Sequence, residues 1–473
     1  MNAAIPVHAL QGAPKRPPSN TLLAALRERF GSRCSTATAV CEQHGRDEST
    51  YPVTPPDAVV FCESTDDVSA VVALAAAHAV PVIPFGTGSS LEGHLLAVQG
   101  GISVDVSRMA AVLQINAEDL TVTVQAGVTR EQLNREIRDT GLFFPIDPGA
   151  NASLGGMAAT RASGTNAVRY GTMRENVLGL QVVTAAGEVI RTGTRAKKSS
   201  AGYDLTRLFV GSEGTLGVMT EITLKLYPLP EAVVAAFCHF PSIDAAVRTT
   251  IQVIQMGVQI ARCELLDAHA IRAVNAHSKL TLREAPMLLM EFHGSDASVA
   301  EQAATVQEIA REFGGEDFEW ARSPEERTRL WTARHKAYFA ALQMRPGCRS
   351  LSTDTCVPIS SLAESIHESV IEAEAAGLPY WIVGHVGDGN FHLSYLLDPH
   401  SVEEAATAER LSELMVRRAI RLGGTCTGEH GIGLHKIGYL VDEAGAGAVA
   451  VMRSIKQALD PLNIMNPGKI FIA

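Results

Sequence analysis

Two histidines flank a glycine-rich turn in the stretch Gly384–His392, which reads Gly-His-Val-Gly-Asp-Gly-Asn-Phe-His. Asp-Gly between extended residues is a strong signal for a two-residue hairpin loop. With the loop at Asp388 and Gly389, His385 falls directly opposite His392, with Cβ atoms ~5 Å apart on one face. That separation suits two imidazoles that hold one metal ion. Two unrelated histidines beside a turn are the alternative, and this stretch alone leaves both interpretations open.

Three loops of small residues before residue 230 could bind phosphate groups. They are Gly86–Gly93 after an expected strand at Val80–Phe85, Asp147–Thr160 with a helix start at about Leu154, and Gly211–Gly217 before an expected strand at 218–226. Backbone N–H groups converge on an anion only where side chains do not block the approach, and a helix N-terminus adds its dipole. No Walker-type lysine follows any loop, which favours one large diphosphate cofactor over a nucleoside triphosphate.

The chain has 473 residues, 46% hydrophobic and 19% charged, so it can build large cores. The formal net charge of -11 argues against nucleic acid and anionic membrane surfaces as main partners. The eight cysteines form no C-x-x-C pair, which argues against a zinc ribbon or an iron–sulfur cluster. Residues 1–20 are expected to form a flexible arm, and no apolar run is long enough to span a bilayer. Any membrane association should be peripheral.

The pattern changes after Tyr227–Pro230, which contains two prolines. Beyond it, strands alternate with long helical segments, which is typical of an α+β unit. Strands are expected near 232–240, 259–266, 286–293, 317–322, 350–357, 380–386 and 391–397, and helices near 242–256, 267–278, 296–313, 324–344, 359–376 and 401–422. The tight turn at Asp388 and Gly389 predicts a sheet that is at least partly antiparallel.

The motifs together resemble a known family. Residues 80–93, 147–171 and 211–226 are similar to the flavin domain of FAD-linked oxidases of the vanillyl-alcohol-oxidase type. Further motifs follow in family order and resemble its D-lactate dehydrogenase (cytochrome) branch; they are Trp331–Lys336, Ser352–Pro358, the hairpin, Gly428–Gly431 and Asn466–Lys469. The resemblance covers nearly the whole chain after about residue 50.

The resemblance implies an α+β fold of two domains. The FAD domain would span 1–228 with a C-terminal return at 424–473, and an inserted substrate (cap) domain with a largely antiparallel sheet would span 229–423. The implied reaction is oxidation of a D-2-hydroxy acid, chiefly D-lactate to pyruvate, with hydride transfer to FAD and electrons passed to cytochrome c or a quinone. Separately from the resemblance, the scattered cysteines and the lack of a long apolar run favour a reducing, cytosol-like compartment. A cytoplasmic protein is therefore expected, with peripheral association with the inner membrane and a homodimer both compatible.

Other functions stay open at this point. The substrate could instead be glycolate or D-2-hydroxyglutarate. A flavin-free metallohydrolase would leave the three glycine-rich loops without a role. A non-catalytic flavin subunit of a larger complex would leave Glu429 and His430 without one. Relatives that act on 2-hydroxyglutarate carry a lysine at about Ser352, so serine there points to a smaller monocarboxylate.

The resemblance also implies which residues contact FAD. Covalently flavinylated relatives carry a histidine at about the position of Ser90, so the serine here implies dissociable FAD. The expected contacts are Pro84, Gly86, Thr87, Gly88, Ser89, Ser90, Pro148, Leu154, Gly155, Gly156, Ala159, Thr160, Ser163, Gly164, Val168, Gly214, Val218 and Asn466.

With the family order counted, His385, His392 and Glu429 would hold a divalent metal, Zn or Mn, with open coordination positions. Such a metal would bind the substrate's hydroxyl and carboxylate. His430 is the candidate general base, because a histidine pKa lies near neutrality. The alternative for His430 is a histidine that only orients Glu429.

Arg334 is the candidate clamp for the substrate carboxylate, because its planar fork matches a carboxylate. The alternative is a helix-surface arginine paired with an acid such as Glu326. Lys336 and Asn390 are further candidates for the catalytic site. Asn390 could hydrogen-bond the substrate or only satisfy the turn, and Asp354 could orient a neighbour.

Overall fold

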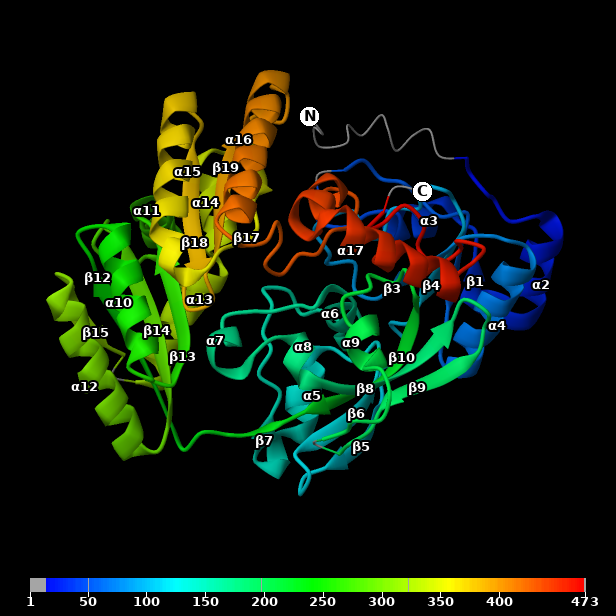
Figure 1. The fold of residues 1–473 in the computed structure, drawn as a ribbon, viewed down its shortest axis with the longest axis horizontal. Helices are drawn as coiled ribbons and strands as arrows, with labels where there is room; N and C mark the ends of the chain where they lie inside the picture. The colour runs from blue at the N-terminus through cyan, green and yellow to red at the C-terminus, as the bar shows by residue number, and fades with distance from the viewer. Residues whose placement is uncertain (1–13, 50, 197, 322, 472–473) are drawn as a thin grey trace. The chain divides into compact units, whose positions relative to one another are not determined.

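The computed structural model describes residues 14–49, 51–196, 198–321 and 323–471, so most of the expected N-terminal arm lies outside the described residues. The chain divides into two compact units. The first contains Met1–Ser163, Gly171–Leu229 and Glu429–Ala473, and the second contains Gly164–Tyr170 and Pro230–Gly428. Figure 1 labels the elements of both units. The short segment Gly164–Tyr170 therefore groups with the second unit, whereas the sequence assigned it to the first domain.

A small sheet opens the first unit, in the order β1 (Cys34–Ser35), β2 (Ala58–Phe61), β4 (Ile102–Asp105) and β3 (Val82–Phe85). Strands β2 and β3 both run parallel to β4, which lies between them. The crossover between β2 and β3 is α4 (Thr65–Ala77), whose N-terminus is capped by the Ser64 side chain. The sequence analysis did not predict β4, although it is buried throughout. Strand β3 of this sheet leads directly into the first small-residue loop, which begins at Gly86.

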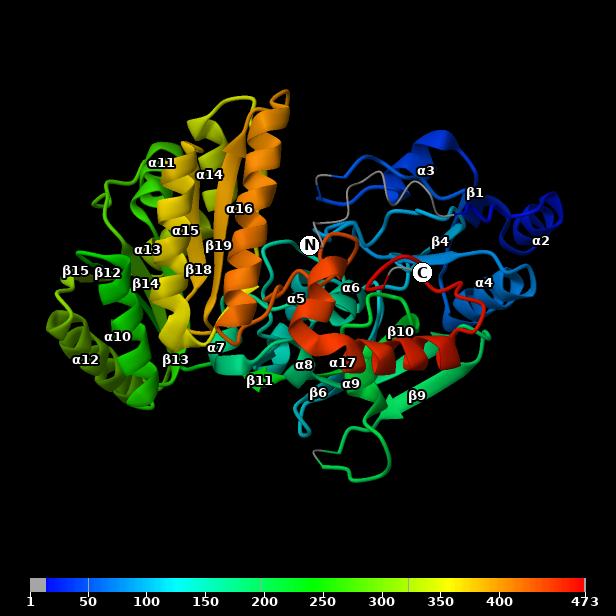
Figure 2. The same cartoon turned by 45° about the horizontal axis from the view of Figure 1, so that its top comes forward.

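The second sheet of this unit is antiparallel, in the order β5 (Val112–Asn116), β6 (Thr121–Gln125), β10 (Gly217–Lys225), β8 (Val177–Thr184) and β9 (Val189–Gly193) (Figure 1). Figure 2 labels β6, β10 and β9 again in a turned view. Strands β8 and β9 form a hairpin. The other elements of the unit are α2 (Asn20–Phe30), α3 (Thr38–His44), α5 (Arg130–Ile137), α6 (Leu154–Thr160), α8 (Met173–Asn176), α9 (Leu205–Phe209), α17 (Ile437–Leu459), β7 (Leu142–Phe143), β11 (Tyr227–Pro228) and two 3₁₀ turns, Gly31–Arg33 and Arg138–Thr140.

One antiparallel sheet organises the described part of the second unit, which confirms the expected largely antiparallel sheet. Its order is β15 (Glu316–Trp320), β12 (Ala232–His239), β14 (Met287–Gly294), β13 (Ile260–Leu266), β18 (Tyr380–His385), β19 (Asn390–Leu397) and β16 (Arg349–Ser352), with β17 (Thr355–Cys356) also paired to β19. Short α7 (Ala167–Tyr170) contacts β13.

Helices cover both faces of this sheet because its side chains alternate. On β14, Leu288 and Met290 lie in one core, whereas Met287 and Leu289 lie in the other. The first core is closed by α10 (Ile243–Gln255), α12 (Asp296–Glu312), α15 (Leu362–Ala376, after the 3₁₀ turn Ile359–Ser361) and α16 (Val402–Arg421), and the second by α11 (Ala268–Ser278), α13 (Pro324–His335) and α14 (Ala337–Met344). The single helix expected at 324–344 is therefore two helices, which meet at Lys336.

Both units are thus α+β, as the sequence predicted. Across the described ranges, no helix combines the length and the apolar character that a bilayer crossing needs.

Candidate functional site

The hairpin that carries the two histidines exists, but its predicted register is wrong. His385 pairs with Asn390, and His392 pairs with Val383. The loop therefore has four residues, 386–389, rather than two. A shift of two positions preserves the face, because strand side chains alternate with a period of two. His385 and His392 are thus diagonal neighbours on one face, with ring centroids 5.6 Å apart.

Each imidazole is held in one orientation through Nδ1. His392 donates from Nδ1 to the backbone oxygen of Thr353 (2.9 Å), an atom that can only accept. His385 donates from Nδ1 to a carboxylate oxygen of Glu264 (2.6 Å). Both Nε2 atoms then carry a lone pair, which is the tautomer that a metal ligand needs. One ring nitrogen of each histidine lies within 4.8 Å of one on the other.

Arg334, the last-turn arginine of α13, is paired with Glu264 and not with Glu326. Its Nε and Nη2 atoms donate to Oε2 of Glu264 at 3.0 and 2.7 Å. Burial would raise the pKa of Glu264, but the interactions with His385 and Arg334 outweigh it and lower this pKa. Nη1 of Arg334 makes no hydrogen bond or ion pair with the residues that the structure describes. Lys336 follows α13 and is exposed.

Sheet alternation brings these side chains together. Leu266 and Val383 face the core under α11, α13 and α14, so Glu264 and His385, two positions away on the same strands, face it too. Glu264 and His385 are also register partners across β13 and β18. Since α13 covers this face, the Arg334 side chain can reach the same carboxylate.

Asn390 is buried and held from one side. Its Nδ2 donates to Asp354 Oδ1 (3.0 Å) and to the Thr355 oxygen (2.9 Å). Its Oδ1 is buried and has no hydrogen-bond partner in the described part of the chain. A Cβ at Gly428 would lie 2.2 Å from Asn390 Nδ2, so only glycine fits there. Asp354 does orient a neighbour, and Asn390 keeps an acceptor free.

In the first unit, the three small-residue loops interlock. A Cβ at Gly86 would lie 2.3 Å from the Ser153 hydroxyl, and one at Gly214 would lie 2.9 Å from Pro84. Gly214 also has a φ of +72°, which favours glycine. Asn466 Nδ2 donates to the backbone oxygens of His94 (3.1 Å) and Glu213 (2.8 Å) and so ties the C-terminal return to these loops.

Most of the residues that are expected to contact FAD lie in the first unit, which contains these three loops. The helix expected at Leu154 begins there, is capped by Ser153 and ends at Thr160. The Ser90 hydroxyl donates to Asp47 (3.0 Å). The members in the first unit are Pro84, Gly86, Thr87, Gly88, Ser89, Ser90, Pro148, Leu154, Gly155, Gly156, Ala159, Thr160, Ser163, Gly214, Val218 and Asn466, whereas Gly164 and Val168 lie in the second unit. There Val168 packs against Gly387 of the hairpin loop.

His430 is oriented by Glu92, a buried carboxylate at the end of the first loop. His430 donates from Nδ1 to Glu92 Oε1 (3.2 Å), which leaves Nε2 as a proton acceptor. Lys436 (3.0 Å) and His435 (2.9 Å) bind the same carboxylate. Burial would raise the pKa of Glu92, but Lys436 and the two histidines hold this pKa well below its usual range. Glu213 accepts from the next backbone amides, Ile432 and Gly433.

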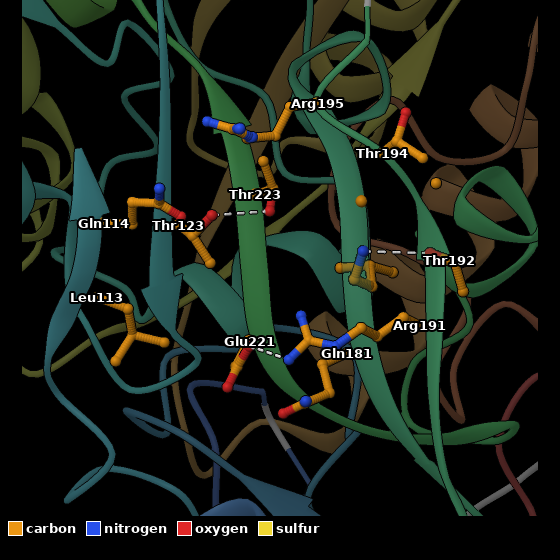
Figure 3. A pocket seen from close by; sticks show the side chains of 13 residues that line it. Leu113, Gln114, Thr123, Gln181, Arg191, Thr192, Thr194, Arg195, Glu221 and Thr223 are labelled. Carbon is orange, nitrogen blue, oxygen red and sulfur yellow. Dashed lines mark hydrogen bonds and ion pairs between the residues drawn. The ribbon is translucent and has the colours of Figure 1, made fainter. Parts of the chain in front are cut away.

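A separate hollow of about 430 Å³ lies over the antiparallel sheet of the first unit (Figure 3). Some of its polar groups pair with one another: Arg191 pairs with Glu221 (3.3 Å), and the Thr123 and Thr223 hydroxyls lie 3.0 Å apart. None of the expected site residues lines this hollow. It has the character of a solvated sheet face.

Two family descriptions match the chain. Residues 56–193 match "FAD binding domain", and residues 229–470 match "FAD linked oxidases, C-terminal domain". The first covers two of the three interlocked loops, and the second covers the sheet with the two histidines together with the C-terminal return. The expected requirement for FAD is confirmed.

Named proteins are similar over most of their length. "Probable D-lactate dehydrogenase, mitochondrial" of Danio rerio is 52% identical over 92% of this chain and 88% of its own. "D-lactate dehydrogenase [cytochrome], mitochondrial" of Arabidopsis thaliana is 47% identical over 90% and 76%. The solved structure of p-cresol methylhydroxylase with substrate bound has a TM-score of 0.79 at 17% identity, over 97% of this chain and 98% of that one. At this low identity, the similarity to p-cresol methylhydroxylase shows that the two proteins share a fold and shows nothing about function.

One expectation is contradicted by these relatives. Both D-lactate dehydrogenases carry the word mitochondrial in their names, which conflicts with the expected cytoplasmic location. The expectation came from scattered cysteines and the lack of an apolar run, and a reducing compartment is not unique to the cytoplasm.

The sequence analysis missed Glu92 and Glu264. Glu264 had a visible signal, because it interrupts the otherwise apolar run Cys263–Leu266 in an expected strand. A carboxylate in such a position must be paired when it is buried. Glu92 lies in the loop Gly86–Gly93, whose small residues alone suggested a function.

Proposed function

Because the chain belongs to the FAD-linked oxidase family and is an FAD-dependent oxidoreductase, we propose that it oxidises D-lactate to pyruvate. The single observation that carries the choice of substrate is the 52% identity to a D-lactate dehydrogenase across nearly the whole chain. Catalytic oxidation of D-lactate with release of pyruvate, measured with cytochrome c and with a quinone analogue as acceptors, tests the proposal and identifies the acceptor. Oxidation of glycolate or D-2-hydroxyglutarate in preference to D-lactate would favour those alternatives.

The residues divide the work of the reaction. FAD, held by the three interlocked loops of small residues, would supply the acceptor for the hydride of the substrate's α-carbon and would hand the two electrons on to the external acceptor. His430 takes the hydroxyl proton at Nε2, since Nδ1 is committed to Glu92. Arg334 binds the substrate carboxylate through Nη1, and Asn390 holds the hairpin in place through its hydrogen bonds to Asp354 and Thr355.

A small substrate agrees with the surroundings of Ser352. Its hydroxyl lies 2.8 Å from that of Ser394, and both are neutral. The second carboxylate of a substrate such as 2-hydroxyglutarate would find no positively charged side chain at position 352. The pair therefore supports a monocarboxylate.

We also propose that His385, His392 and Glu429 hold a divalent metal, zinc or manganese. The two histidines fit the group, because each donates Nδ1 to an acceptor and presents Nε2 on the same face. Glu429 directly follows Gly428, whose backbone packs on Asn390, so its Cα lies ~3.8 Å from that of Gly428. The metal would act as a Lewis acid on the substrate oxygens.

FAD is expected to be released when the protein is precipitated with acid. Ser90 offers a hydroxyl that is already bound to Asp47, and a serine cannot form the histidyl link of flavinylated relatives. The flavin absorbance of the supernatant measures the release. Flavin that stays in the pellet would show a covalent link at another residue.

Replacing Arg334 with alanine is expected to lower kcat/KM for D-lactate by an amount that corresponds to a loss of about 2–5 kcal/mol in transition-state binding, because one partner of a desolvated charge pair is lost. Arg334→Lys keeps a cation beside Glu264 but loses the planar fork, so its deficit should be smaller but clear. Steady-state kinetics of both variants measure the difference. An unchanged kcat/KM in the alanine variant would move the clamp role to Lys336.

A further inference from the structure

Glu264 stands between two groups that the proposed function uses separately. Its side chain is fully buried in β13. Oε1 accepts from Nδ1 of His385 (2.6 Å), and Oε2 accepts from Nε and Nη2 of Arg334 (3.0 and 2.7 Å). One carboxylate therefore orients both the expected metal ligand and the expected carboxylate clamp.

Only an ionised carboxylate serves both neighbours. It offers acceptors to each side, so His385 must place its proton on Nδ1 and its lone pair on Nε2. It also accepts hydrogen bonds from two of the three nitrogens of the Arg334 guanidinium, Nε and Nη2. Nη1 can then bind the substrate carboxylate. A buried carboxylate is costly without such partners, and removal of either partner would leave it uncompensated.

Resting on the proposed function, we propose that Glu264 is a positioning residue that couples metal binding to recognition of the substrate carboxylate. It acts through the tautomer of His385 and the orientation of Arg334, and it contacts neither metal nor substrate itself. Loss of its charge should therefore weaken the metal before any substrate is present. It should also weaken substrate binding.

The matched control lies on the next strand of the same sheet. Glu291 is buried, accepts from His293 (2.8 Å) and lies 3.6 Å from Arg262, so it repeats the Glu–His–Arg combination without any expected site residue. Glu291→Gln removes a comparable buried charge. It should leave metal affinity unchanged.

The experiment compares Glu264→Gln, Glu291→Gln and His392→Ala as FAD-loaded proteins. Each is stripped of metal and titrated with Zn²⁺ against a chromogenic chelator. In Glu264→Gln, Arg334 would bind the amide oxygen of the new glutamine side chain. The amide nitrogen would then donate to Nδ1 of His385, so the ring proton of His385 would move to Nε2. Zinc affinity should fall about 10–100-fold, as is typical when the partner of a metal-binding histidine is lost. The KM for D-lactate in saturating zinc should rise.

The outcomes separate the two levels of the proposal. Wild-type zinc affinity in Glu264→Gln, with a loss in His392→Ala, would overturn the role of Glu264 and keep the metal site. Unchanged affinity in His392→Ala would overturn the metal site itself. If Glu264→Gln does not fold, the double variant Glu264→Gln/Arg334→Met removes both buried charges, and the same loss of zinc affinity is expected.

Discussion

Replacing His430 with asparagine is expected to slow the reduction of FAD by D-lactate about 10²–10⁴-fold, which is the usual contribution of a positioned general base. The hydroxyl proton must leave as the hydride departs, and Nε2 of His430 is the acceptor that Glu92 presents. FAD content, metal content and binding of a lactate analogue should stay near those of the wild type. Anaerobic stopped-flow measurement of flavin bleaching gives the rate directly.

His435 supplies the control for this experiment. It donates to the same carboxylate, at Oε2 of Glu92 (2.9 Å), but it has no assigned part in the reaction. His435→Asn should therefore reduce FAD at close to the wild-type rate. If His430→Asn instead loses metal and recovers full chemistry when metal is saturating, His430 only orients Glu429.

Removal of the metal is expected to abolish turnover and leave the flavin spectrum unchanged. The proposed ligands His385 and His392 lie on β18 and β19 of the second unit, whereas the interlocked loops expected to hold FAD lie in the first. His392→Ala should lower metal affinity by at least about 100-fold, more than the loss of a partner that only orients a ligand. Chelation followed by activity and metal analysis measures both effects.

A buried histidine elsewhere on the same sheet provides the comparison. His239 ends β12, and burial lowers its pKa. His239→Ala should bind metal as the wild type does. Full activity in a protein verified to be free of metal would contradict the metal proposal.

Local patterns predicted the elements and faces of the site better than its contacts. The Asp-Gly turn identified the hairpin, and the shared face of His385 and His392 survived a wrong register because the error was two positions. The small-residue loops were also recognisable, since close approaches such as Gly86 on Ser153 exclude larger side chains. These features depend on short stretches of chain.

Contacts between segments that lie far apart in the sequence could not be predicted from it. Glu264 is separated from His385 by 121 residues, and Glu92 from His430 by 338, so no periodicity or spacing links them. The partner of Arg334 was sought about two turns away on the same helix, at Glu326, because neighbours along one helix are the only ones that a sequence displays. The actual partner comes from a strand that the helix covers.

Anaerobic titration of the FAD-loaded protein with D-lactate tests the central claim most directly. Stoichiometric bleaching of the flavin by D-lactate, with release of pyruvate and with no bleaching by L-lactate, is the predicted result. A flavin that stays oxidised with D-lactate but is bleached by glycolate or D-2-hydroxyglutarate would contradict the assignment of the substrate.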